Sequence, residues 1–278
     1  MLELHCHTTC SDGTLTPEAL VQAAIAAGVK AMAITDHDTL AGCERAIAAA
    51  GNQLEIIPGV ELSTVHRERS LHILGFYPDF AKLEAPLQDR IAGRKQRAHA
   101  MADKLADLGF PITLPEMSGG MAPGRPHVAQ ALVQAGYVNH AQEAFTRWLG
   151  DGGPAYVQYD PFPATDGIRL LRDCGAVPVW AHPYLFRGGT VATVLPELVD
   201  AGLMGVEVYH PNHSPSDERK LEELCDRYDL LVTGGSDYHG PSKDKNKSGV
   251  SLNGLKVPLS LLPPLKAAAT KLKAAAIA

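Results

Sequence analysis

Histidines and carboxylates recur in this chain at spacings that suit metal binding. His5 and His7 stand two residues apart in LHCHTT, and Asp237 and His239 repeat that spacing in GGSDYHG. Alternate residues of a β-strand share one face, so both members of such a pair can hold one ion. Imidazole mixed with carboxylate suits manganese, iron or zinc better than magnesium or calcium. The spacing therefore predicts a site for one of these three metals.

Further residues of the same types follow short apolar runs elsewhere in the chain. The complete set of candidate ligands is His5, His7, Asp12, His37, Glu61, His72, His182, Asp237 and His239. A lone histidine is more often structural. However, when several separate strands each end in a histidine or carboxylate, simple solvation of these side chains is a poor explanation. The set exceeds what one ion needs, whereas three ions with about three protein ligands each would keep positions open for water and substrate.

Alternating strands and helices would position these ligands. We expect strands near residues 2–6, 30–35, 55–63, 71–76, 176–181, 205–209 and 230–235. A helix over 17–27 has Thr16 as its N-cap and Gly28 as its stop, and Ser214 opens another helix with a capping-box pattern. The alternation predicts a parallel sheet or a (β/α) barrel, in which the carboxyl ends of the strands meet at one mouth.

One long segment interrupts the alternation. It contains no convincing strand and instead predicts helices, over 86–108, 126–136 and 141–149. We interpret residues 86–158 as a helical insertion that covers the active site, and residues 1–85 and 159–278 as the metal-binding barrel. A final Ala/Lys-rich helix follows near the end of the sequence.

The insertion carries basic residues placed for anion binding. Arg90, Arg94 and Arg97 share one helical face. Arg125 and His127 stand where a helix begins, and free backbone amides favour anions there. We expect Arg94, Arg97, Arg125 and His127 to contact a phosphate remote from the metals, since guanidinium groups suit that task. A solvated basic face is the alternative. Lys243, near the last metal motif, is expected to be a solvated loop lysine.

Composition excludes several classes of protein. The 278 residues are 45% hydrophobic and 20% charged, as in ordinary globular domains. No apolar run is long enough for a membrane span, and no signal peptide is evident, so we expect a cytoplasmic protein. The net charge of −6 argues against a surface for duplex nucleic acid. The five cysteines show no pairing pattern and are expected to be reduced and mostly buried. No obligate protein partner is evident.

Taken together, the motifs resemble the PHP (polymerase and histidinol phosphatase) domain family. The matching motifs are HCH with Asp12, TDHD, GVE, LHILG, AHP and GSDYH, within residues 1–76 and 176–240. The resemblance implies an α/β fold, a distorted seven-stranded (β/α) barrel, with a centre of three divalent metal ions that hydrolyses phosphoesters. Manganese is the expected metal, with zinc and iron as alternatives.

The resemblance also implies a role for each ligand. His5, His7, Glu61 and Asp237 would hold the first ion; Glu61 would bridge to the second, with His72 and His182; Asp12, His37 and His239 would hold the third. Asp36 would orient a ligand. A metal-bridging hydroxide, held by His5, His7, Glu61, His72, His182 and Asp237, would attack phosphorus in line. His213 is a candidate general acid and phosphate contact. The formal charge of the centre, about +3, suits a phosphate dianion.

The segments RKQRAHAM and GRPHVAQALV resemble one PHP subgroup with a helical insertion. That subgroup includes bacterial 3′,5′-nucleotide bisphosphate phosphatases and 5′→3′ exoribonucleases that act on very short RNA. We therefore expect hydrolysis of the 3′-phosphate of nucleotide 3′,5′-bisphosphates, with short oligoribonucleotides as further substrates. Two alternatives stay open. A histidinol-phosphate phosphatase or another small-molecule phosphatase would not need the arginines, and a non-catalytic PHP module would not need the complete ligand set.

Overall fold

The computed structural model describes residues 1–116, 122–158, 162–241 and 250–275. The chain divides into two compact units. Unit 1 comprises Met1–Ala85 and Phe162–Ala278, and unit 2 comprises Pro86–Pro161. Within the described ranges, no helix is both long enough and apolar enough to cross a membrane.

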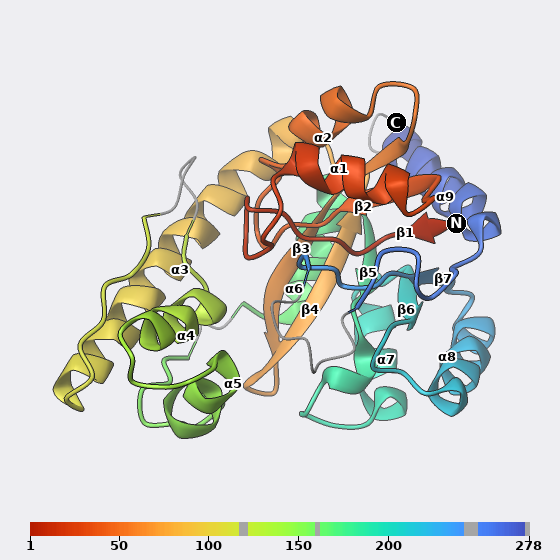
Figure 1. Ribbon diagram of the computed structural model, residues 1–278. Helices are drawn as coiled ribbons and strands as arrows, with labels where there is room; N and C mark the ends of the chain where they lie inside the picture. The colour runs from red at the N-terminus through yellow and green to blue at the C-terminus, as the bar shows by residue number, and fades with distance from the viewer. Residues whose placement is uncertain (117–121, 159–161, 242–249, 276–278) are drawn as a thin grey trace. The chain divides into compact units, whose positions relative to one another are not determined.

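Unit 1 contains seven strands that form one sheet in chain order (Figure 1). They are β1 (Leu2–Glu3), β2 (Ala31–Ile34), β3 (Glu55–His66), β4 (Arg69–Phe76), β5 (Val177–Trp180), β6 (Gly205–Tyr209) and β7 (Leu231–Gly234). β4 runs antiparallel to β3 and β5, and the other neighbouring pairs are parallel. The predicted strands and the α/β class are confirmed.

The chain after β1 lies beside the chain after β7, which nearly closes the sheet into a barrel. The Leu4 amide donates to the Gly234 carbonyl at 3.1 Å, and the His7 amide donates to the Tyr238 carbonyl at 2.9 Å. The Tyr238 amide donates to the His5 carbonyl at 3.2 Å. This seam joins distant parts of the sequence and places His5 and His7 next to the segment that carries Asp237.

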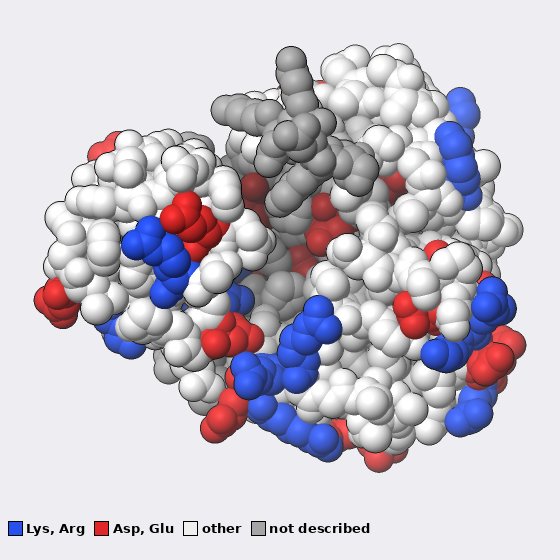
Figure 2. Space-filling view, turned by 60° about the horizontal axis from the view of Figure 1, so that its bottom comes forward, with Lys and Arg blue, Asp and Glu red and all other residues white. Residues whose placement is uncertain are grey.

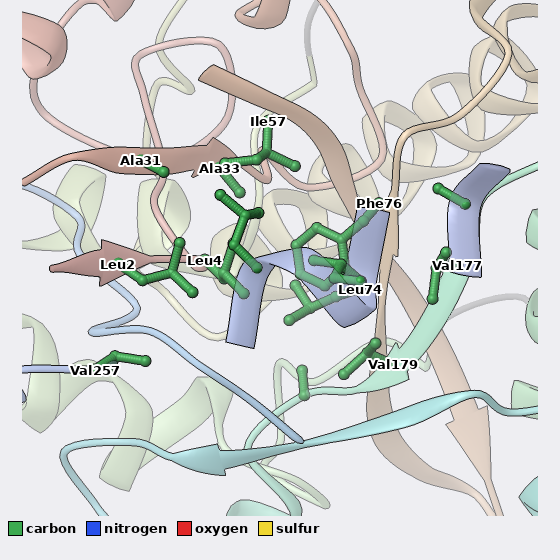
Figure 3. Close-up of a cluster of buried hydrophobic side chains, with 14 residues drawn as sticks. Leu2, Leu4, Ala31, Ala33, Ile57, Leu74, Phe76, Val177, Val179 and Val257 are labelled. Atoms are coloured by element: carbon green, nitrogen blue, oxygen red, sulfur yellow. The ribbon is translucent and has the colours of Figure 1, made fainter. Parts of the chain in front are cut away.

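Apolar side chains from β1 to β5 point toward one another and form a buried cluster (Figure 3). The labelled members are Leu2, Leu4, Ala31, Ala33, Ile57, Leu74, Phe76, Val177, Val179 and Val257. Helix α9 (Leu262–Ala275) packs Leu262 and Leu265 against the same cluster. Each fully buried Leu or Phe stabilises the fold by about 1.5–3 kcal/mol, so this cluster anchors the strands whose ends carry the polar residues.

The other helices of unit 1 follow the strands in the expected alternation. They are α1 (Pro17–Ala26), α2 (Cys43–Ala50), α6 (Ala164–Asp173), α7 (Val191–Asp200) and α8 (Pro215–Tyr228), with short 3₁₀ turns at Pro183–Leu185 and Leu259–Leu261. The predicted caps are present: the Thr16 side chain accepts from the Ala19 amide at 3.2 Å, and Ser214 and Asp217 form a reciprocal capping box.

Unit 2 is helical and has an apolar core of its own, which includes Met101, Leu132 and Trp148. Its helices are α3 (Phe80–Asp107), which starts in unit 1, α4 (Arg125–Gln134), α5 (Ala141–Ala144) and the π-helical turn η2 (Phe145–Leu149). The predicted start of the long helix at residue 86 is wrong. Asp79 accepts from the Lys82 amide at 3.3 Å and so caps an earlier first turn. Pro86 lies inside the helix and removes only one backbone hydrogen bond.

Candidate metal centre

Glu61 lies at the centre of the predicted ligands, and its two carboxylate oxygens face different groups of histidines. Oε2 is 3.3 Å from His5 Nε2 and 3.2 Å from His7 Nε2. Oε1 is 2.8 Å from His72 Nδ1 and 3.1 Å from His182 Nε2. Glu61 is only 1% exposed. A buried carboxylate whose two oxygens face separate groups of histidines has the geometry of a bridging ligand.

Asp12 forms the centre of a neighbouring group. Its Oδ1 is 3.2 Å from His239 Nε2 and 3.6 Å from His7 Nδ1. Its Oδ2 is 3.7 Å from His37 Nε2. The opposite nitrogen of His37, Nδ1, is 3.2 Å from Glu61 Oε2. His7 and His37 therefore each present one nitrogen to the Asp12 group and the other to Glu61.

Asp237 completes the set from the end of β7. Its Oδ1 is 3.3 Å from His5 Nε2 and 3.2 Å from His7 Nε2. Asp237 has φ 52°, and His182, two residues after the end of β5, has φ 33°. Side chains other than glycine rarely adopt this left-handed region, and each such residue costs about 1–3 kcal/mol. Strain at two strand ends that carry candidate ligands is typical of a functional site.

The ligand atoms gather in three groups, and within each group all of them lie within 4.8 Å of one another. The groups are His7, Asp12, His37 and His239; His5, His7, Glu61 and Asp237; and His37, Glu61 and His72. Nε2 of His5 and Nε2 of His7 are buried and have no hydrogen-bond partner among the described residues. Buried nitrogens of this kind, aimed at carboxylates, fit divalent cations that prefer imidazole and carboxylate donors. The structure thus brings all the predicted ligands together.

In the metal-free protein, these groups perturb one another's pKa strongly. Burial alone would raise the pKa of Glu61, but the imidazoles around it, His37 first, lower it well below its ordinary value. Asp12 has a pKa well below the usual range because His37 and His239 outweigh the effect of burial. Burial would lower the pKa of His7, but its contacts with Asp237 and Glu61 raise it to about 10. In the absence of metal, protonated imidazoles therefore balance the charge of the carboxylates in this site.

We expect the metal-free protein to lose stability as the pH rises above neutrality. The pKa of His7 rises from 6.5 to about 10 on folding, so its contribution is complete below pH 6.5 and is lost as the pH approaches 10. The depressed pKa values of Asp12 and Glu61 act in the opposite direction, since their contribution is lost only in acid. Thermal unfolding in EDTA should therefore show a falling Tm above pH 6.5, and His7→Gln should flatten the slope. A Tm that rises over this range would contradict the assignment.

Asp36 acts one layer away from the ligands. Its carboxylate accepts from the Thr8 amide and from the Ser11 hydroxyl, both at 2.7 Å. Ser11 Oγ is in turn 3.4 Å from His7 Nδ1. Burial raises the pKa of Asp36. Asp36 therefore fixes the loop that presents His7 and Asp12.

Sequence reasoning missed Glu207, a fully buried carboxylate on β6 that contacts His5. The signal was present, since Glu207 interrupts the otherwise apolar strand GVEVY.

Cys6, by contrast, is a free thiol packed with Met32 and Ile34, as predicted. All five cysteines are free and buried.

A cavity of about 260 Å³ opens beside the ligands within unit 1. Its lining includes His37, Glu61, His72, His182, Asp237 and His239, together with the apolar Leu71, Trp180, Leu185 and Phe186. Figure 2 shows acidic side chains recessed below the surrounding surface of this unit, with basic side chains farther out. The polar wall suits cations and the charged end of a substrate, and the apolar wall suits an uncharged part.

His213 is buried close to this site. Its ring lies 5.2 Å from that of His210 and 5.4 Å from that of Tyr184. Its Nδ1 donates to the Val208 carbonyl at 2.8 Å, and burial lowers its pKa. A neutral imidazole with its proton on Nδ1 offers Nε2 as an acceptor. This arrangement counts against His213 as the general acid.

Two of the three arginines predicted to bind substrate lie over one ring in unit 2. The guanidinium groups of Arg97 and Arg125 lie 5.5 and 5.4 Å from the centre of the Tyr156 ring. Arg97 Nε donates to the Val157 carbonyl at 2.7 Å. Arg125 Nη1 donates to Asp151 at 2.9 Å. Cation–π contacts of this kind hold both guanidinium groups in place.

The remaining predicted contacts lie at the start of α4. His127 Nδ1 accepts from the Gly124 amide at 3.1 Å. Arg94 is 9% exposed, and its Nη2 lies so close to Gly124 that a side chain at that position would collide with it. Arg94, Arg125 and His127 therefore converge on one helix terminus. Lys243 lies outside the described residues.

The PHP domain model matches residues 3–112. A 5′-3′ exoribonuclease from Haemophilus influenzae is 36% identical over 86% of this chain and 90% of its own length. A phosphoribosyl 1,2-cyclic phosphate 1,2-diphosphodiesterase from Eggerthella lenta is 34% identical over 86% and 94%. A 3′,5′-nucleoside bisphosphate phosphatase from Chromobacterium violaceum is 32% identical over 87% and 88%.

The fold comparison agrees with the sequence comparison. The structure of a proposed metal-dependent phosphoesterase from Bifidobacterium adolescentis superimposes with a TM-score of 0.84 and 30% identity, over 96% of each chain. The match therefore includes the helical unit 2 as well as the barrel. With these relatives, this barrel and these clustered ligands, the chain belongs to the PHP domain family of phosphoesterases.

Proposed function

We propose that this phosphoesterase hydrolyses the 3′-phosphate of nucleotide 3′,5′-bisphosphates, converting 3′-phosphoadenosine 5′-phosphate to AMP and phosphate, and that it also degrades very short oligoribonucleotides from the 5′ end. The observation that supports the proposed hydrolysis is the position of the Glu61 carboxylate, whose two oxygens face separate groups of histidines. Paired metal ions at such a carboxylate stabilise the attacking and leaving oxygens of phosphoryl transfer.

Each ligand has a role in this proposal. His5, His7, Glu61 and Asp237 would hold the first ion, Glu61 with His72 and His182 would hold the second, and Asp12, His37 and His239 would hold the third. Bound divalent ions, with manganese expected, would supply positive charge for the phosphate dianion and activate water as the nucleophile. Asp36 orients the loop of His7, and the apolar wall of the cavity offers a surface for an uncharged part of the substrate.

Unit 2 supplies the selectivity in this proposal. Arg94, Arg97, Arg125 and His127 bind the phosphate that is not transferred, and two of the arginines are already oriented by Tyr156. Nucleotide bisphosphates and short RNA both have a phosphate on each side of one ribose, and these basic residues can bind one of the two phosphates. The names of the Haemophilus and Chromobacterium relatives support these two substrate classes.

One substrate panel separates this proposal from its alternatives. With manganese present, 3′-phosphoadenosine 5′-phosphate should be turned over with the highest kcat/KM, ahead of histidinol phosphate, an aryl phosphate and a ribosyl 1,2-cyclic phosphate. A preference for histidinol phosphate would replace the bisphosphate assignment. Failure to hydrolyse the whole panel would favour a non-catalytic PHP module.

We expect the product of the reaction to retain its 5′-phosphate. If unit 2 binds the 5′-phosphate, the metal centre acts on the 3′-phosphate, and the products are AMP and inorganic phosphate. Phosphorus NMR of the reaction with 3′-phosphoadenosine 5′-phosphate distinguishes the two regiochemistries directly, with authentic AMP as the reference. Release of adenosine 3′-phosphate would show that the substrate binds in the opposite direction.

A further inference from the structure

Glu207 on β6 contacts two predicted ligands while lying outside the ligand set. Its Oε1 and Oε2 are 3.0 and 3.2 Å from His5 Nδ1. Oε2 also accepts from the backbone amide of His182 at 2.8 Å. Glu207 and His5 are both fully buried. One carboxylate therefore joins the side chain of one ligand to the backbone of another.

The contact with His5 determines which nitrogen of that imidazole is available. When Nδ1 donates its proton to Glu207, Nε2 presents a lone pair. Nε2 lies 3.3 Å from both Glu61 Oε2 and Asp237 Oδ1. A proton on Nε2 instead would block this nitrogen as a ligand. An acceptor at Nδ1 thus selects the tautomer that can bind a cation.

The contact with His182 restrains a strained backbone. His182 lies two residues after the end of β5 and has φ 33°, in the left-handed region. A residue in that region returns to a commoner conformation unless its surroundings hold it. The hydrogen bond from the His182 amide to a buried carboxylate is charge-assisted and stronger than one to a neutral acceptor. It keeps the His182 ring directed at Glu61, 3.1 Å from Oε1.

We propose that Glu207 is a positioning residue for the metal centre, which fixes the tautomer of His5 and the backbone of His182. The inference rests on the proposed metal centre. It predicts that Glu207 controls metal affinity without being a ligand.

Glu3 provides a matched control on the neighbouring part of the barrel. It is a glutamate on β1 that is as fully buried as Glu207. Its oxygens accept from the backbone amides of Ser236, at 3.0 Å, and Asn253, at 2.7 Å. Among the described residues, no hydrogen bond or ion pair joins Glu3 to an imidazole. Glu3→Gln therefore measures the loss of a buried carboxylate that does not contact a histidine.

The test is Glu207→Gln, with Zn²⁺ affinity measured by competition against a chromophoric chelator at constant pH. Glutamine keeps the volume but has a single acceptor oxygen, so its NH₂ group must face either His5 Nδ1 or the His182 amide, which are both donors to Glu207. We expect a loss in Zn²⁺ affinity of about 10- to 100-fold. Glu3→Gln should lower Tm, yet leave Zn²⁺ affinity within about threefold of wild type. Equal affinities for Glu207→Gln and wild type, or an equal loss in Glu3→Gln, would overturn the proposal.

A second measurement works even if Glu207→Gln does not fold. Nitrogen-15 NMR of the zinc-loaded wild-type protein, labelled at histidine, reports the protonation of each ring nitrogen. His5, assigned with His5→Gln, should carry its proton on Nδ1 and bind zinc through Nε2. Zinc bound through Nδ1 would overturn the role of Glu207 while leaving the metal centre intact. A wild-type protein that binds no Zn²⁺ would overturn both the centre and the inference.

Discussion

Replacing Glu61 with glutamine is expected to remove metal and activity together. Glu61 lies between two groups of histidines, so both ions lose a shared anionic ligand in the variant. Metal catalysis contributes several kcal/mol to the stabilisation of the transition state, so kcat/KM should fall by at least about 1,000-fold. Elemental analysis after dialysis and a phosphatase assay on the same sample provide the measurement.

Asp12→Asn is the control for this prediction. Asp12 contacts His37 and His239, which are the other ligands expected around the third ion, and also His7. Its loss should therefore release mainly the third ion and leave the other two bound. Full metal occupancy in Glu61→Gln would rule out the bridging role. Equal metal loss in both variants would show that the three groups bind cooperatively as one unit.

Replacing Arg125 with alanine should weaken catalysis on the bisphosphate selectively. The guanidinium belongs to the group around Tyr156 in unit 2, and we propose that it binds the phosphate that is not transferred. A charge-assisted contact of this kind contributes about 1.5–3 kcal/mol. We therefore expect kcat/KM for 3′-phosphoadenosine 5′-phosphate to fall by about 10- to 150-fold. Turnover of an aryl phosphate, which lacks a second phosphate, should change little.

Asp151→Asn separates substrate binding from a structural role of Arg125. Arg125 and Asp151 form a partly exposed ion pair, at 2.9 Å. If Arg125 serves only to hold Asp151, the two variants should behave alike. If Arg125 binds phosphate, removal of the competing carboxylate should leave kcat/KM unchanged or raise it. Equal losses on the bisphosphate and the aryl phosphate in Arg125→Ala would instead indicate a role in the fold of unit 2.

The sequence was most informative where short-range patterns determine structure. Apolar runs ending in His or Asp predicted the strands and the clustering of the ligands, because alternation and strand ends are local properties. The start of α3 was predicted too late, because the cap at Asp79 supports an earlier first turn. The antiparallel direction of β4 depends on pairing with β3 and β5, which no local pattern reports.

Long-range contacts also explain why Glu207 was missed. Its partner His5 stands about 200 positions earlier in the chain, so only the folded barrel brings the two together. The same holds for the arginines: their spacing predicted one helical face, but not that Arg97 and Arg125 share the ring of Tyr156. Residue type and spacing predict which groups can do chemistry, and tertiary packing determines which of them meet.

The seam between the segments after β1 and β7 has a consequence for synthesis of the protein in the cell. His5 and His7 are synthesised well before Tyr238, whose carbonyl accepts from the His7 amide. At 5–20 residues per second, roughly 10–50 s separate the two events. During that time the first two histidines lack the partner strand and Asp237. The nascent chain therefore cannot build the first ion site before Asp237 has been added, and metal loading of that site is expected to follow barrel closure.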